Sequence, residues 1–135
     1  MFTRFAQPAR FFALAARITP WLWGWVVLGV AVGWPGSRIF VQPDYQQGDT
    51  VRIMYVHVPA AWMAMFVYAS MAIASFVALV WRHPLAEIAA VASAPIGAAF
   101  TFCALVTGSL WGKPMWGTYW EWDGRMTSVL ILFFI

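Results

Sequence analysis

The sequence predicts an all-α integral membrane protein with three transmembrane helices and the start of a fourth. Of its 135 residues, 63% are apolar and only 10% are charged, whereas soluble domains usually carry about 25% charged residues. Apolar runs also recur that are long enough to cross a bilayer, which takes about 20 residues. We therefore expect a single membrane domain over residues 1–135, in contact with the lipid bilayer.

The first transmembrane helix is expected over residues 18–34, between Arg17 and the Pro35-Gly36 pair. Residues 9–18 are expected to form a short amphipathic helix in the membrane interface. Because no small-x-small cleavage pattern follows the apolar run, we interpret this region as an uncleaved signal-anchor.

Two further transmembrane helices are expected over residues 60–81 and 88–110. The last of them carries small residues at i, i+4 spacing, a pattern that lets two membrane helices approach closely; they are Ala89, Ser93, Gly97 and Thr101. A fourth apolar run begins at about residue 127 and reaches only about 13 Å by Ile135. We therefore interpret the sequence as the N-terminal part of a longer protein.

The positive charges favour a cytoplasmic N-terminus. The two sides of the predicted topology carry equal numbers of Lys and Arg, so the decision rests on the flank of the first helix, which holds Arg4, Arg10 and Arg17. The loops after the first and third helices are separated by an even number of crossings, so both face one compartment. We expect that compartment to be the periplasm, and the membrane to be the bacterial inner membrane or its equivalent.

The distribution of the ten tryptophans is the most informative feature of the sequence. Six of them lie at or near expected helix ends, where indoles gather at the membrane interface: Trp21, Trp23, Trp25, Trp34, Trp62 and Trp81. The other four lie in residues 111–126, the expected extracytoplasmic loop; they are Trp111, Trp116, Trp120 and Trp122. Such a cluster suits a large planar ligand with charged edges, such as a porphyrin, and an elaborate aromatic belt is the alternative.

Residues 116–123 read W-G-T-Y-W-E-W-D and fit the W-G-x-x-W-x-W-D signature of haem-handling membrane proteins of cytochrome c biogenesis. Together with residues 44–62 and the flanks of the signature, the chain resembles the haem exporter protein C family of the cytochrome c maturation system over nearly its whole length. The resemblance implies extracytoplasmic binding of haem b between two axial histidines, and its presentation to a membrane-anchored haem chaperone. The other implied partners are an ABC-type ATPase with its membrane subunit and a small single-helix membrane protein.

The resemblance implies that His57 is one axial ligand of the haem iron and that the second ligand lies beyond Ile135. His57 precedes Pro59 at the start of a predicted helix, where the positive helix end disfavours imidazolium. The neutral ring is the form that ligates iron, although an interfacial structural histidine is the alternative. His83 is expected in a solvated loop on the opposite side. The expected haem-binding loop contains Trp111, Trp116, Gly117, Tyr119, Trp120, Trp122 and Asp123.

Arg52 and Arg125 are possible partners of the haem propionates through charge-assisted pairs, with anchoring at the membrane surface as the alternative. Asp123 would repel a propionate, so its carboxylate is expected to orient an indole N–H, a backbone amide or Arg125. The only cysteine, Cys103, is expected to be a buried core residue.

The sequence predicts haem handling and delivery rather than an enzyme. It contains no nucleophile–base pair, phosphate-binding loop or basic run suited to nucleic acid, and no C-x-x-C-H motif of a c-type cytochrome. Two alternatives are a haem-translocating transport subunit and a structural membrane anchor of the assembly complex. The transport reading is disfavoured because the second and third helices carry no mid-membrane charge.

Overall fold

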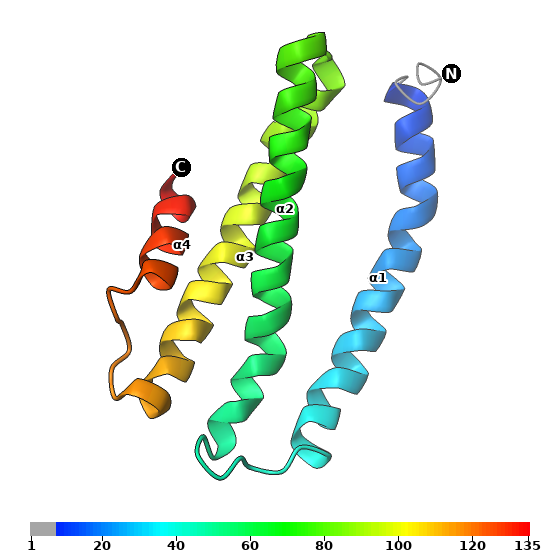
Figure 1. Cartoon of the computed structure of the whole chain (residues 1–135). Helices are drawn as coiled ribbons and strands as arrows, with labels where there is room; N and C mark the ends of the chain where they lie inside the picture. Colours follow the sequence, from blue (N-terminus) through cyan, green and yellow to red (C-terminus); the bar gives the residue numbers. More distant parts are fainter. Residues whose placement is uncertain (1–7) are drawn as a thin grey trace. The chain divides into compact units, whose positions relative to one another are not determined.

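The computed structural model describes residues 8–135, and the described chain is helical without a strand (Figure 1). The predicted all-α fold is therefore confirmed. The elements are α1 (Pro8–Ile39), η2 (Asp49–Ile53), α2 (Met54–Trp81), α3 (Pro84–Trp116) and α4 (Gly124–Phe134). Contacts divide the chain after Gln42 into two units.

The first unit is built on α1, a single continuous helix. The predicted interfacial helix and the predicted span over residues 18–34 are parts of this one element, which also runs through Pro35 to Ile39. A proline removes only one backbone donor, and the carbonyl of Gly36 still accepts a bond from the Phe40 amide at 3.0 Å. Of the three flanking arginines, Arg4 lies outside the described residues.

The length of α1 changes the interpretation of its tryptophans. Trp21, Trp23 and Trp25 lie near the middle of α1 and not at its end, as the shorter predicted helix had placed them. Its 32 residues extend about 48 Å, more than the roughly 30 Å of hydrocarbon in a bilayer. The three indoles therefore fit a membrane interface only where the first turns of α1 project beyond the bilayer.

The second unit is an antiparallel pair, α2 and α3, and the short α4 packs against it (Figure 1). The turn between α2 and α3 consists of Arg82, in the left-handed region at φ 49°, and His83 in an extended conformation. The extended conformation is the one that a following proline imposes. Pro84 then occupies the first turn of α3, where its missing N–H costs no helical bond.

Both helices of the pair are longer than the sequence predicted. α2 begins at Met54, with η2 directly ahead of it, so Pro59 lies inside the helix and not at its first position. α3 starts before residue 88 and continues through Pro114 to Trp116. The predicted loop over residues 111–126 is therefore wrong in part, because its first six residues are helical and its last three belong to α4.

Small residues allow α2 and α3 to pack closely. A Cβ atom built on Gly97 would lie 3.1 Å from Cγ1 of Val67, and Thr101 is completely buried. The predicted small-residue contact is confirmed at these positions, whereas Ala89 is exposed. The buried residues along this contact are Ala60, Ala64 and Val67 of α2 and Gly97, Thr101 and Ala104 of α3.

Three segments of the described chain are long and apolar enough to cross a membrane: Ala9–Ile39, Asp49–Trp81 and Pro84–Trp116. The three predicted transmembrane helices are confirmed on this criterion. α4 starts at Gly124, three residues before the expected position, and contacts both long helices. The Tyr68 hydroxyl donates to the Leu132 carbonyl, and the ring of Phe102 lies 6.1 Å from that of Phe133.

Candidate functional site

His57 lies in the first turn of α2 and faces the C-terminal part of α3. Its Nδ1 atom is 3.0 Å from the Thr107 hydroxyl oxygen, and its ring stacks on Trp111 with 6.4 Å between centroids. A Cβ atom on Gly108 would lie 3.1 Å from Cε1 of His57. The half-buried imidazole therefore fits against α3 only because residue 108 is a glycine.

Trp111 is held by a residue from the segment that precedes α2. Its indole N–H donates to the side-chain carbonyl of Gln47 at 2.7 Å. Gln47 belongs to a tight turn in which the Asp44 carboxylate accepts from the backbone amides of Gln46 and Gln47. The turn closes at Gly48, whose φ of 55° favours glycine. This bond brings residues far apart in sequence to one end of the α2–α3 pair.

Trp116 is the last residue of α3 and folds back over the preceding turn. Its ring makes an edge contact with Trp111 at 5.8 Å between centroids. A Cβ atom on Gly112 would lie only 3.0 Å from the Trp116 ring, so a larger residue there would displace the indole. The guanidinium of Arg125, from α4, lies 5.5 Å from the centre of the same ring, within the range of a cation–π contact.

The glycine and the aspartate of the W-G-x-x-W-x-W-D signature mark two helix ends. Gly117 ends α3 in the left-handed region at φ 79°, and its amide donates to the Lys113 carbonyl at 3.0 Å. Asp123 is the N-cap of α4, where its carboxylate accepts from the Met126 amide at 2.8 Å. The two residues therefore fix where the connecting segment leaves α3 and enters α4.

Asp123 also binds Arg125, at 2.7 Å to Nη2 and 2.9 Å to Nε. The Met126 amide and the Arg125 guanidinium together hold the pKa of this carboxyl below its ordinary value, because both favour its charged form. Of the three partners expected for Asp123, the structure shows the backbone amide and the arginine.

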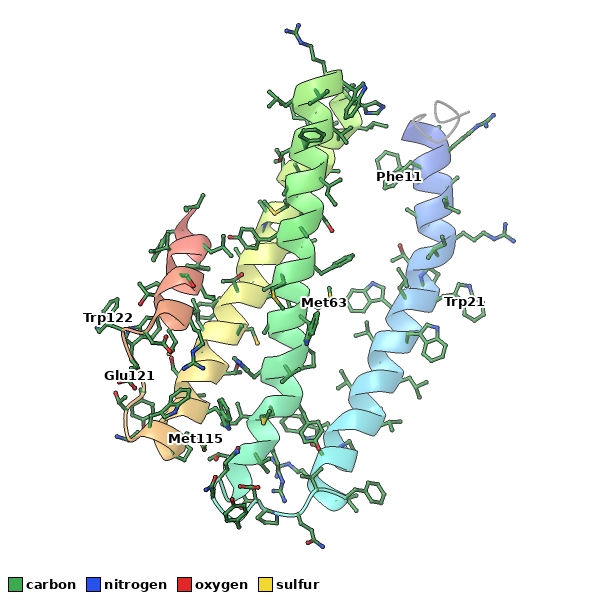
Figure 2. All side chains as sticks on the ribbon, viewed as in Figure 1. Phe11, Trp21, Met63, Met115, Glu121 and Trp122 are labelled. Atoms are coloured by element: carbon green, nitrogen blue, oxygen red, sulfur yellow. The ribbon has the colours of Figure 1, made fainter. Side chains whose placement is uncertain are left out.

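The remaining aromatic residues of the signature lie in the segment between α3 and α4. Trp120 and Trp122 make an edge contact at 5.5 Å, and the Lys113 ammonium lies 5.1 Å from the ring of Tyr119. Trp122 is 76% exposed, and Figure 2 shows it, with Glu121, pointing away from the helices. Tyr119 and Trp122 are therefore available to a large ligand or a partner, whereas the indole nitrogen of Trp120 is buried and has no hydrogen-bond partner among the described residues.

A cavity of about 270 Å³ opens between α2, α3 and α4. Five of the residues predicted to belong to the haem site line it: His57, Trp111, Trp116, Asp123 and Arg125. The other predicted site residues are elsewhere. Arg52 forms an ion pair with Asp49 inside η2 at 2.9 Å, and Gly117, Tyr119, Trp120 and Trp122 are not among the residues that line the cavity.

Three contributors to this site were not predicted from the sequence, namely Gln47, Thr107 and Gly108. The glycine extends the small-residue spacing of α3, since Gly108 and Gly112 follow Ala104 at four-residue intervals, and that signal could have found it. Gln47 and Thr107 carry no local signal. Cys103, expected in the core, is only half-buried.

The fold and this site define a polytopic helical membrane protein with a histidine and two tryptophans in a largely apolar cavity beside a helix pair. The chain belongs to the family described as "Heme exporter protein C", whose model matches residues 1–135.

Curated relatives carry the same description. The protein of Bradyrhizobium diazoefficiens is 64% identical over 128 residues, which cover 95% of this chain and 48% of the relative. That of Escherichia coli K12 is 53% identical over 130 residues, covering 96% and 53%. That of Paracoccus denitrificans is 46% identical over 132 residues, covering 96% and 53%. The chain thus spans about half the length of the curated relatives it matches.

Proposed function

We propose that the chain binds haem in the cavity between α2, α3 and α4 and presents it to a membrane-anchored haem chaperone during c-type cytochrome biogenesis. One observation carries this proposal. The cavity unites a half-buried histidine, two indoles and an arginine from three helices. The description of the relatives as heme exporters supports the same conclusion.

Each of these groups matches one part of haem. A neutral imidazole is an axial ligand of haem iron, which assigns His57 to the metal. The faces of Trp111 and Trp116 offer apolar stacking surface to the macrocycle. Arg125 carries a positive charge at the rim, and its side chain is 78% exposed, so it is accessible to a propionate.

The ion pairs already present limit how much Arg52 and Arg125 can contribute to haem affinity. Arg125 is already paired with Asp123, and Arg52 with Asp49, so a propionate would share each guanidinium with a carboxylate. The Arg125 side chain is largely exposed to solvent, where an ion pair contributes little on its own. Iron ligation and stacking therefore supply most of the affinity, and Arg125, the arginine that lines the cavity, orients the haem edge.

The size of the cavity indicates how haem is held. Its volume of about 270 Å³ lies just below the range of roughly 300–1,000 Å³ for small-molecule sites. The cavity therefore takes one edge of haem b and leaves the opposite edge open for transfer. About half of each relative's length lies outside the match, and we assign the second axial histidine to an equivalent region.

The open edge determines where partners act. The exposed aromatic segment with Tyr119 and Trp122 is the part of the site that a haem chaperone would meet. The ABC-type ATPase with its membrane subunit and the small single-helix protein would assemble on the membrane-embedded surfaces. In this arrangement the protein lies in the bacterial inner membrane with its N-terminus cytoplasmic, its aromatic segment periplasmic, and no chemical step of its own.

The test compares the two histidines of the described chain. The full-length protein is purified from haem-replete membranes, and its Soret absorbance per protein is measured for wild type, His57→Ala and His83→Ala. His83 is the matched control because it follows the far end of α2, and His57 and Trp81 lie about 36 Å apart along that helix. We expect the band to weaken or shift in His57→Ala and to stay unchanged in His83→Ala.

Other outcomes would support the alternative functions. A wild-type protein without haem would overturn haem binding and favour a structural anchor of the assembly complex. Equal haem in all three proteins would exclude His57 as a ligand. A translocating subunit would require haem contacts along the apolar length of α2 and α3, and substitutions there would then reduce haem content more than His57→Ala does.

A further inference from the structure

The hydroxyl of Thr107 has its single proton committed to α3. Its oxygen lies 2.6 Å from the Cys103 carbonyl and 3.3 Å from the Ala104 carbonyl. Carbonyl oxygens only accept hydrogen bonds, so the Thr107 proton must point toward one or both of them. In a hydrogen bond with any other neighbour, the Thr107 oxygen can therefore act only as the acceptor.

That neighbour is Nδ1 of His57, at 3.0 Å. With the threonine proton donated to α3, the threonine oxygen faces Nδ1 as an acceptor, and the Nδ1–H tautomer completes this hydrogen bond. A neutral imidazole has one N–H, so Nε2 is left with a free lone pair. The structure shows no hydrogen bond from Nε2 to any residue of the described range 8–135.

Packing holds the ring in this orientation. The Nδ1–Cε1 edge lies against Gly108, at 3.6 and 3.1 Å from the position of a built Cβ atom. One face of the imidazole stacks on Trp111 with an interplanar angle of 26°. A 180° flip of the ring would keep the stacking on Trp111 but would put Cδ2 in place of Nδ1 and lose the bond to Thr107.

We propose that Thr107 is a positioning residue that fixes His57 as the Nδ1–H tautomer and so presents an unprotonated Nε2 to haem iron. The inference rests on the proposed haem-binding function and deepens it. Groups that hydrogen-bond the distal nitrogen of a ligating histidine orient the ring and raise its basicity, and their loss typically lowers metal affinity about 10- to 100-fold. Thr107 would supply that second contact here.

Three variants of the full-length protein separate this role from a structural one. Thr107→Val keeps the shape and removes the oxygen, whereas Thr107→Ser keeps the oxygen. Ser93→Ala is the control, because the Ser93 hydroxyl makes the same bond to a carbonyl four residues earlier, at 2.7 Å. Ser93 lies about 21 Å from Thr107 along the same helix.

The first measurement is made without haem. The ¹⁵N chemical shifts of His57, assigned by comparison with His57→Ala in nanodiscs, report which nitrogen carries the proton. We expect the Nδ1–H form in wild type, Thr107→Ser and Ser93→Ala, and a shift to the Nε2–H form or a mixture in Thr107→Val. An Nε2–H ring in wild type, or an unchanged spectrum in Thr107→Val, would overturn the inference.

The second measurement is haem titration of the same proteins followed at the Soret band. Thr107→Val should weaken binding about 10- to 100-fold, and Thr107→Ser and Ser93→Ala should bind as wild type does. Equal affinity in Thr107→Val would contradict a positioning role for Thr107. A wild type that shows the Nδ1–H form but binds no haem would instead refute the proposed function, and with it the ligand role of Nε2.

Discussion

The two ends of the α2–α3 pair contain similar residues and differ in structure. Each has one histidine, with a proline within two residues of it. At one end, His57 is half-buried, bonded to Thr107 and stacked on Trp111. At the other end, the side chain of His83 is exposed and makes no capping bond to α3.

The difference arises from how many segments meet at each end. The His83 end is a two-residue turn between helices, so its side chains point outward. At the His57 end, the turn around Gln47, the last turns of α3 and the start of α4 converge. The two ends therefore differ because three segments converge around His57 and only one turn surrounds His83, although the residue types are similar.

Among changes that leave His57 and Thr107 in place, the largest effect is expected from filling the space beside His57. Gly108→Ala would place a Cβ atom 3.1 Å from Cε1 of His57 and displace the ring from Thr107. Haem affinity, measured by Soret titration, should fall roughly tenfold, as for other losses of a ligand's supporting contact.

Gly97→Ala is the matched control, since its Cβ atom would also lie 3.1 Å from a side chain, that of Val67. This substitution crowds the contact between α2 and α3 without touching His57, so haem affinity should stay at the wild-type value. Equal losses in both variants would show that the site depends only on the packing of α2 against α3.

A smaller effect is expected from releasing Trp111. Gln47→Leu removes the acceptor of the indole N–H, which the structure places at 2.7 Å. Loss of such a bond costs about 1 kcal/mol, which thermal unfolding in detergent should show. The exposed neighbour Gln46 is the control, and Gln46→Leu should change stability by less than about 0.5 kcal/mol. The same destabilisation in both variants would mean that stability depends on the turn around residues 44–48 and not on the bond from Trp111 to Gln47.

The sequence predicted most of this end of the molecule in outline but not its helix boundaries. The apolar runs gave the three spans, because lipid leaves the backbone no alternative to a helix. The aromatic segment was placed in a loop because it follows the end of the third expected helix at residue 110. α3 nevertheless continues to Trp116 and ends at Gly117, so two of the four clustered indoles lie on a rigid helix.

The rest of the site could not be predicted because its contacts are tertiary. The bond from Trp111 to Gln47 and that from His57 to Thr107 join residues separated by 64 and 50 positions. No local pattern marks either partner. Gln47 resembles any polar turn residue, and Thr107 resembles any threonine bonded to its own helix.

The smallest effect is expected at the cap of α4. The pKa of Asp123 is lowered in the folded protein by the Met126 amide and by Arg125. The cap is therefore fully formed above the ordinary aspartate pKa of about 3.9 and is lost as the pH falls through the lower folded value. Exchange of the Met126 amide, corrected for its intrinsic rate, should accelerate over that acidic range.

Two variants isolate this cap. Asp123→Asn keeps a good N-cap without a titrating group, so its Met126 protection should not change with pH in that range. Asp123→Ala should lose protection at every pH. An identical pH profile in wild type and Asp123→Asn would assign the change to another group.

The central claim is that His57 ligates haem iron inside this cavity, and chemical rescue tests it most directly. In His57→Gly the imidazole is removed and leaves space for a free imidazole from solution. We predict that His57→Gly loses the wild-type Soret band and regains it when imidazole is added, whereas His83→Gly is unaffected throughout. A His57→Gly protein that keeps the wild-type band without imidazole would contradict the account.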